Sequence, residues 1–160
     1  MTALFIVLAI FQINSTDKMS TSQEIKKERQ IKASSQKVWD ILTHPDNIEK
    51  WLYGTRVKTD WKPDSDIIFS FTWNGKEYND KGTVLEFEPE KRFSYNYWSE
   101  LSGIPNKPEN YSVITFELAP DDTGTLLKLT HTNFATKTMY EHSDSNWEEA
   151  LNLIKTLSEQ

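Results

Sequence analysis

The sequence predicts an α+β fold in which a curved antiparallel β-sheet wraps around one long C-terminal helix. Three observations support this fold class. About seven segments alternate apolar and polar residues, as half-buried strands do. Two short helical segments follow the first of these strands. The chain ends in an amphipathic segment with helical spacing, and packing it against the sheet buries both apolar faces at once.

The first strand is expected at residues 24–33, where Ile25 and Ile31 share one side of the alternation. Ser34 or Ser35 can then cap a short helix over residues 36–42, because a serine hydroxyl accepts a bond from a free backbone N–H of the first turn. The next residues, His44 and Pro45, end that helix. Pro45 also suits the first turn of a second short helix, expected at residues 46–52.

Strand signals dominate from residue 56 to residue 134. The dipeptide Asn74-Gly75 is a strong hairpin signal, because both central residues of such a turn need positive φ. Gly82 is expected at a bulge or bend, and Val84 and Trp98 are expected on the outer face. Residues 100–110 form the longest predicted loop. The expected strands are 56–62, 67–73, 76–88, 92–99, 111–118 and 125–134.

The last helix is expected to begin near Ser145. Ser145 and Glu148 have the spacing of a capping box, and Trp147, Leu151 and Ile154 follow at helical intervals. This helix would supply the apolar stripe that the sheet covers.

Residues 1–18 are expected to lie outside the domain, which we place at residues 22–158. Nine consecutive apolar residues, 3–11, are too few to span a bilayer, which takes about 20. They suit the apolar part of a secretory signal, but no Lys or Arg precedes them and no clear cleavage site follows. Alternatively Met19 is the true start. We favour Met19 and a cytoplasmic location, with export as the alternative.

Composition excludes several classes of function. The chain of 160 residues has no cysteine and a net charge of −6. A disulfide scaffold and a cysteine nucleophile are therefore excluded, and nucleic acid or an anionic membrane is a poor partner. The three histidines lack metal-ligand spacing, and no phosphate-binding glycine loop or nucleophile motif is present. We expect no metal, no cofactor and no stable membrane insertion, and assign no catalytic residue.

The aromatic residues are the unusual part of the composition, with eight Phe, six Trp and six Tyr. They can fill the core or line a cavity between the sheet and the helix, and Tyr and Trp slightly favour a cavity because each needs a polar partner. His131 lies on the inward side of its strand. It can be a buried histidine bonded to backbone or a tyrosine hydroxyl, a polar anchor for a ligand, or a catalytic base. Lys27 and Arg29 are expected to splay to solvent, with the cavity mouth as the alternative.

Five segments together resemble the SRPBCC (START-like, Bet v 1-like) superfamily, and within it the group similar to the C-terminal domain of the activator of Hsp90 ATPase. Each segment is weak alone, but they follow the order seen in the family. They are residues 31–46 with Trp51, 82–93, 113–118, 124–132 and 146–151. The resemblance implies a helix-grip fold, a seven-stranded sheet gripping the last helix. One departure is Asn146, where many relatives have Gly.

The resemblance also implies a hydrophobic cavity. Carried over by position, its walls would be Phe69, Phe71, Tyr95, Tyr97, His131, Trp147 and Leu151, and the inward pattern of the sequence adds Trp51 and Phe116.

Three functions follow as hypotheses. The first is binding of a small hydrophobic or aromatic molecule, such as a lipid, a polyketide or a flavonoid-like compound. The second is binding of a protein partner, for example as a chaperone cofactor of the Hsp90 type. Activation of Hsp90 itself is disfavoured, since the activator also has an N-terminal domain for which residues before the first strand leave no room. The third is a cavity enzyme with His131 as acid or base. Composition does not predict an oligomeric state.

Overall fold

The computed structural model of the protein describes residues 23–160. The expected N-terminal segment, residues 1–18, and the expected first domain residue, Ser22, lie outside the described residues. In the described part, seven strands form one antiparallel sheet in the order β1-β7-β6-β5-β4-β3-β2. The strands are β1 (Ile25–Ile31), β2 (Arg56–Thr59), β3 (Asp66–Trp73), β4 (Lys76–Glu88), β5 (Arg92–Tyr97), β6 (Ser112–Asp121) and β7 (Gly124–Thr132).

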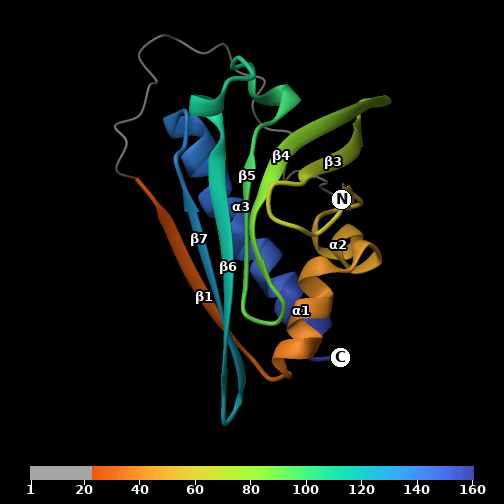
Figure 1. The fold of residues 1–160 in the computed structure, drawn as a ribbon, viewed down its shortest axis with the longest axis vertical. Coiled ribbons are helices and arrows are strands. Elements are labelled where there is room, and N and C mark those ends of the chain that lie inside the picture. Colours follow the sequence, from red (N-terminus) through yellow and green to blue (C-terminus); the bar gives the residue numbers. More distant parts are fainter. Residues whose placement is uncertain (1–22) are drawn as a thin grey trace.

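Three α-helices accompany this sheet. They are α1 (Ser35–Thr43), α2 (Pro45–Trp51) and the long α3 (Lys137–Ser158), and two single 3-10 turns, Glu100–Ser102 and Pro108–Asn110, lie in the loop before β6. Figure 1 shows α3 crossing one face of the sheet, with α1 and α2 beside it. α3 contacts β1, α1 and α2. The predicted α+β class and the seven-stranded sheet around a C-terminal helix are therefore confirmed. No helix within residues 23–160 is both long and apolar enough to cross a membrane.

Local sequence signals account for several element boundaries. The Ser34 hydroxyl accepts a hydrogen bond from the Lys37 N–H at 3.2 Å, so Ser34 is the cap of α1. Pro45 is the first residue of α2. Asn74 and Gly75 have φ of 48° and 76° between β3 and β4, which is the hairpin turn that this dipeptide predicts.

The predicted start of the last helix is wrong by two turns. α3 begins at Lys137, and the Thr136 hydroxyl caps it by accepting a bond from the Met139 N–H. The buried residues of α3 all lie from Trp147 onward. Because the segment 137–146 has no buried apolar stripe, the helical pattern in the sequence only becomes visible near Ser145.

Val84 was expected to face outward, and this is wrong, because it is fully buried. The pairing of β4 with β5 shifts between Val84 and Glu86, which leaves Leu85 as an extra residue. Such a bulge reverses the alternation of faces, so Val84 and Phe87 both point toward the core. Gly82, which was expected at a bulge or bend, lies just before it.

Gly82 has a different role, close backbone packing. A Cβ atom at this position would lie 1.8 Å from the Asn96 carbonyl oxygen on β5. Here the Asn96 side chain accepts the Thr83 N–H at 2.7 Å. Only glycine allows the two strands to approach in this way.

Lys27 and Arg29 were expected to splay to solvent, but they bind α3. The Lys27 ammonium lies 2.9 Å from an Asp144 carboxylate oxygen and 2.6 Å from one of Glu148, and Arg29 also pairs with Glu148. Burial acts to lower the pKa of Lys27, but hydrogen bonds to Glu148 and Asp144 outweigh it and raise the pKa. The first strand is thus joined to the last helix by a charged cluster.

Candidate ligand-binding site

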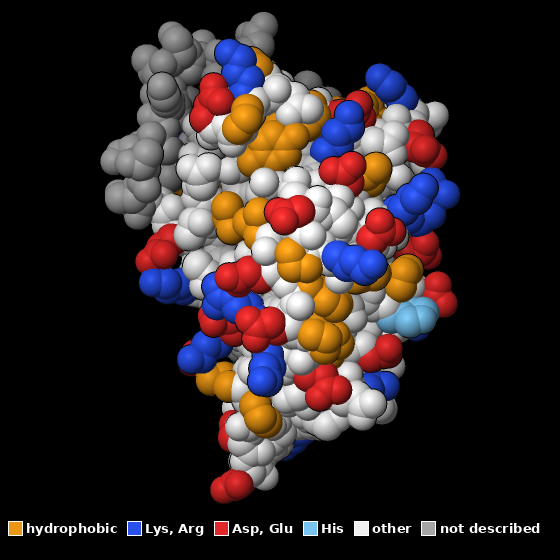
Figure 2. Space-filling view, in the orientation of Figure 1, with side chains coloured by type: hydrophobic (Ala, Val, Ile, Leu, Met, Phe, Trp, Pro, Cys, Tyr) orange, Lys and Arg blue, Asp and Glu red, His pale blue; other side chains and the backbone are white. Residues whose placement is uncertain are grey.

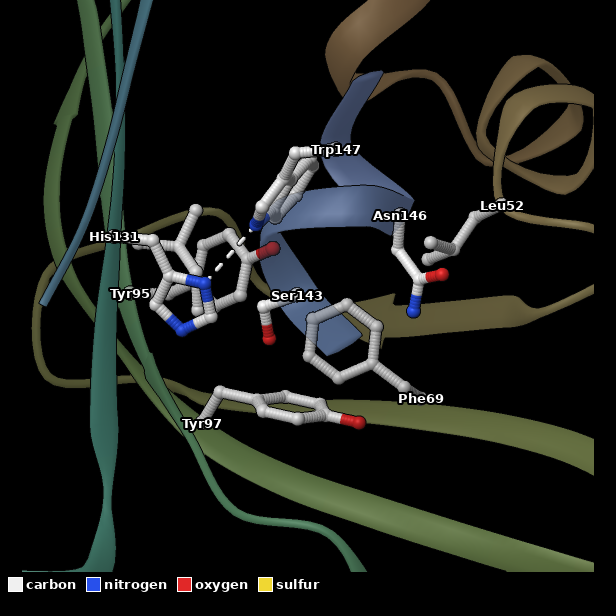
Figure 3. Close-up of a pocket in the computed structure, with 9 residues that line it drawn as sticks. Leu52, Phe69, Tyr95, Tyr97, His131, Ser143, Asn146 and Trp147 are labelled. Atoms are coloured by element: carbon white, nitrogen blue, oxygen red, sulfur yellow. Dashed lines mark hydrogen bonds between the residues drawn. The ribbon is translucent and has the colours of Figure 1, made fainter. Parts of the chain in front are cut away.

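A cavity of about 70 Å³ lies between the inner face of the sheet and α3, near the N-terminal half of that helix. Figure 3 shows its walls, with rings from the sheet on one side and α3 on the other. It is lined by Leu52, Phe69, Tyr95, Tyr97, Ile114, His131, Ser143, Asn146 and Trp147.

Five of the nine residues proposed from the sequence line this cavity. They are Phe69, Tyr95, Tyr97, His131 and Trp147. The other four are buried elsewhere. Trp51, Phe116 and Leu151 belong to the hydrophobic core, where Phe116 packs edge-on against Trp147. Phe71 is buried farther along β3, where its ring stacks on Tyr78.

Four lining residues were not proposed as site residues: Leu52, Ile114, Ser143 and Asn146. Ile114 shares the inward side of β6 with Phe116, so alternation could have found it. Ser143 precedes Trp147 by four residues, which places both on one face of α3. The late predicted start of the helix hid Ser143.

Two hydrogen bonds hold His131 in place. The Trp147 indole N–H, which can only donate, lies 3.0 Å from His131 Nδ1, so Nδ1 is the acceptor and the ring proton is on Nε2. Nε2 lies 2.9 Å from the Ser112 hydroxyl, to which it donates. Burial lowers the pKa of His131 to about 3. The imidazole is therefore neutral at physiological pH, and both of its nitrogens are in use.

A buried carboxyl group lies next to this site. Asp80 is fully buried on β4, directly opposite Phe69 of β3, and the Tyr97 hydroxyl donates a hydrogen bond to it. Its other oxygen accepts the Glu100 N–H at 3.0 Å. Burial raises the pKa of Asp80 to about 7, even though these hydrogen bonds act to lower it. The Tyr97 hydroxyl is thus engaged by the protein itself.

A second hollow, of about 560 Å³, lies between β3, β4 and the loop before β6. Its walls include the exposed residues Lys81, Asn106 and Pro108. It is wider than the cavity, but it lacks the buried aromatic walls that are typical of small-molecule sites. Within residues 23–160, no three His, Asp or Glu side chains gather as a metal site.

The curved sheet, the long helix and the apolar cavity between them define a helix-grip domain. The family of activator of Hsp90 ATPase homolog 1-like proteins matches residues 32–159. The chain belongs to this family, and the resemblance read from the sequence is confirmed. None of the curated proteins matches the chain.

Solved structures from several bacteria share the fold. ChR145 from Cytophaga hutchinsonii is 36% identical, with a TM-score of 0.75 over 86% of this chain and 94% of that protein. Protein MLL2253 from Mesorhizobium loti is 27% identical, with a TM-score of 0.70 over 84% and 96%. The solution structure of an Aha1 dimer from Colwellia psychrerythraea is 24% identical, with a TM-score of 0.66 over 86% and 96%. Family and fold together support a binding domain, without naming what it binds.

Proposed function

We propose that this domain binds a small apolar molecule in the cavity between the sheet and α3. The observation that carries the proposal is the cavity wall itself, in which the rings of Phe69, Tyr95 and Trp147 face the space between the sheet and α3. Apolar and aromatic walls with a few polar groups are typical of small-molecule sites.

The size of the cavity limits the ligand. Ligand pockets commonly measure about 300–1,000 Å³, and a cavity of about 150 Å³ takes up benzene. At about 70 Å³ the cavity is smaller than both. One ring already needs a small outward shift of α3, and a lipid or a multi-ring polyketide would need a larger one, so a molecule with a single ring is the better fit.

Binding has more support than catalysis. A general base needs a free nitrogen and a pKa near the working pH. Both nitrogens of His131 make hydrogen bonds, and burial holds its pKa at about 3. The interpretation of His131 as a buried histidine therefore has the better support, although its partners are Ser112 and Trp147.

A filling mutation tests the proposal. Ser143 lines the cavity from α3, so Ser143→Phe places a ring in the space that a ligand would occupy. We expect wild-type protein to give saturable chemical-shift changes around Trp147 with a panel of one-ring aromatic compounds. Ser143→Phe should lose at least about tenfold in affinity, since it removes the room for a second ring.

Ser145→Phe is the matched control, because Ser145 is exposed on the same helix. It should bind as the wild type does. If no compound in the panel shifts the signals around Trp147, or if both phenylalanine variants bind equally well, the cavity is not the binding site.

A protein partner is the second candidate. It is favoured by the description of the family and by Leu85, the one large hydrophobic side chain that is exposed within residues 23–160. On the face that Figure 2 shows, hydrophobic side chains are interspersed with charged ones. One exposed residue is far from the apolar patch of a stable interface. Sedimentation with and without a purified Hsp90-type chaperone would test this candidate. Sedimentation of the protein alone would also show whether it forms a dimer, as the Aha1 protein from Colwellia psychrerythraea does.

We propose a cytoplasmic location on the basis of the sequence around Met19. The mass of the mature N-terminus from the native host would test it, because a cleaved signal and a start at Met19 give different masses.

A further inference from the structure

We propose that the cavity selects a neutral single-ring molecule that carries one hydroxyl group, a simple phenol, and that the Tyr95 hydroxyl anchors it with help from Ser143. This inference rests on the proposed function and adds the chemistry of the ligand to it.

The Tyr95 hydroxyl is the polar group that points to a ligand. The Tyr95 side chain is 6% exposed and lines the cavity. Its hydroxyl has no hydrogen-bond partner among residues 23–160. A ligand oxygen next to it in the cavity would give this hydroxyl the partner that the described residues do not supply.

The other buried polar groups of the cavity are already paired. The Tyr97 hydroxyl bonds to Asp80, and the Trp147 N–H bonds to His131. Ser143, on the opposite wall, also has a hydroxyl that makes no hydrogen bond within the described part of the chain. Figure 3 shows the Tyr95 hydroxyl pointing toward α3, the helix that presents Ser143.

The cavity favours a neutral ligand. None of the lining side chains carries a charge at neutral pH, because His131 is held in its neutral form. Burial also raises the pKa of Tyr95, so its hydroxyl keeps its proton. An anionic ligand would lose its hydration and find no cation in exchange.

Two hydroxyls on facing walls suit one ligand hydroxyl. A phenol can donate to one of them and accept from the other, since each protein hydroxyl is both donor and acceptor. The rings of Phe69, Tyr95 and Trp147 then surround the ligand ring. The small volume admits one ring once the segment 137–146 of α3, in which Met139 and Tyr140 are only partly buried, shifts slightly outward.

The test compares three compounds of similar shape, which are 4-methylphenol, toluene and 4-methylbenzoate. Titrations of the full chain followed by NMR should show 4-methylphenol binding about tenfold more tightly than toluene, the ratio that one or two hydrogen bonds supply. The anion 4-methylbenzoate should bind weakest. In Tyr95→Phe the advantage of 4-methylphenol over toluene should fall to about twofold or less, while toluene binds as before.

Tyr111→Phe is the control, because the Tyr111 hydroxyl bonds to Asn106 outside the cavity. It should keep the full preference for 4-methylphenol. Equal affinity of wild type for 4-methylphenol and toluene, or an unchanged preference in Tyr95→Phe, would overturn the anchor while leaving the proposed function intact. Failure of all three compounds to bind would overturn both.

Discussion

His131 and Asp80 are both buried on the inner face of the sheet, and burial shifts their pKa values in opposite directions. The pKa of His131 falls to about 3, below its ordinary value of 6.5. The pKa of Asp80 rises to about 7, above its ordinary value of 3.8. In both cases the low-polarity interior disfavours the charged form.

The two shifts have opposite effects on stability. Below pH 6.5 the unfolded chain binds a proton at His131 that the native protein does not, so acid lowers the free energy of unfolding. Between pH 3.8 and pH 7 the native protein keeps a proton on Asp80 that the unfolded chain has lost. At this residue acid therefore raises the free energy of unfolding. From about pH 4 to 6.5 the two effects cancel, because each state then holds one of the two protons.

In Asp80→Asn the effect of His131 on the pH dependence of the free energy of unfolding should become visible, because the opposing effect of Asp80 is removed. Its amide can still accept the Glu100 N–H and can donate to the Tyr97 hydroxyl, which rotates to accept. Between pH 6 and 4.5 we expect the free energy of unfolding of this variant to fall by about 1.4 kcal/mol per pH unit. The wild type should change much less. Urea titrations over this range would measure both.

Asp60→Asn is the control for this experiment, since Asp60 is exposed. It should follow the wild type. A flat profile for Asp80→Asn would show that His131 is not held neutral in the folded protein.

At the scale of elements, the close pairing of β4 with β5 depends on one glycine, Gly82. Gly82→Ala would bring a methyl group to 1.8 Å from the Asn96 carbonyl oxygen, so the strands must separate. We expect a loss of about 3 kcal/mol in the free energy of unfolding, measured by urea titration. Phe69 and Tyr97 lie on the flanking strands, so ligand binding should weaken as well.

Gly54→Ala separates this steric effect from backbone strain. Gly54 has φ of 78° and nothing within 4 Å of an added Cβ atom. Its replacement should cost only about 1 kcal/mol, the strain of a left-handed alanine. A loss for Gly82→Ala that is no larger than this would mean that β4 and β5 can separate freely.

Alternation and turn chemistry predicted most of the elements, and the exceptions have physical causes. The Asn74-Gly75 turn and the cap at Ser34 depend on neighbouring residues alone, so they are visible in the sequence. The inward side of Val84 depends on the bulge at Leu85, for which the sequence has no local signal. The start of α3 was missed because Met139 and Tyr140, in its first turn, are only partly buried, and its fully buried residues begin at Trp147.

At the scale of the whole molecule, the cavity was only partly predictable. Phe69, Tyr95 and His131 follow from alternation, because direction within a strand is a local property. Ser143 and the partners of Asp80 are not local, since Tyr97 and Glu100 lie 17 and 20 residues from Asp80 in sequence. Many aromatic side chains point inward, and only some of them line the cavity. Which ones do so depends on how α3 packs against the sheet.

The charged cluster of Lys27, Arg29 and Glu148 connects the two ends of the described chain. Lys27 is largely buried, with 12% of its side chain exposed, so its bond to Glu148 is shielded more than a surface pair. Glu148→Gln should lower the free energy of unfolding by about 1 kcal/mol at low salt. The loss should shrink in 1 M NaCl, where charges are screened within about 3 Å.

Glu141→Gln offers a comparison, because among residues 23–160 Glu141 pairs only with the exposed Lys137 one turn away on α3. It should leave stability nearly unchanged in thermal melts at either salt concentration. If the two variants behave alike, the contact between β1 and α3 is no stronger than an ordinary surface pair.

The cavity draws three of its nine lining residues, Ser143, Asn146 and Trp147, from a stretch of five positions on α3. Changes in this stretch leave the strands and their turns untouched. New ligand preferences could therefore be selected from a library randomised at Ser143 and Asn146 alone, with Trp147 kept to hold His131. Because the helix residues of the cavity lie in so short a stretch, relatives could likewise change their ligands while keeping the same fold.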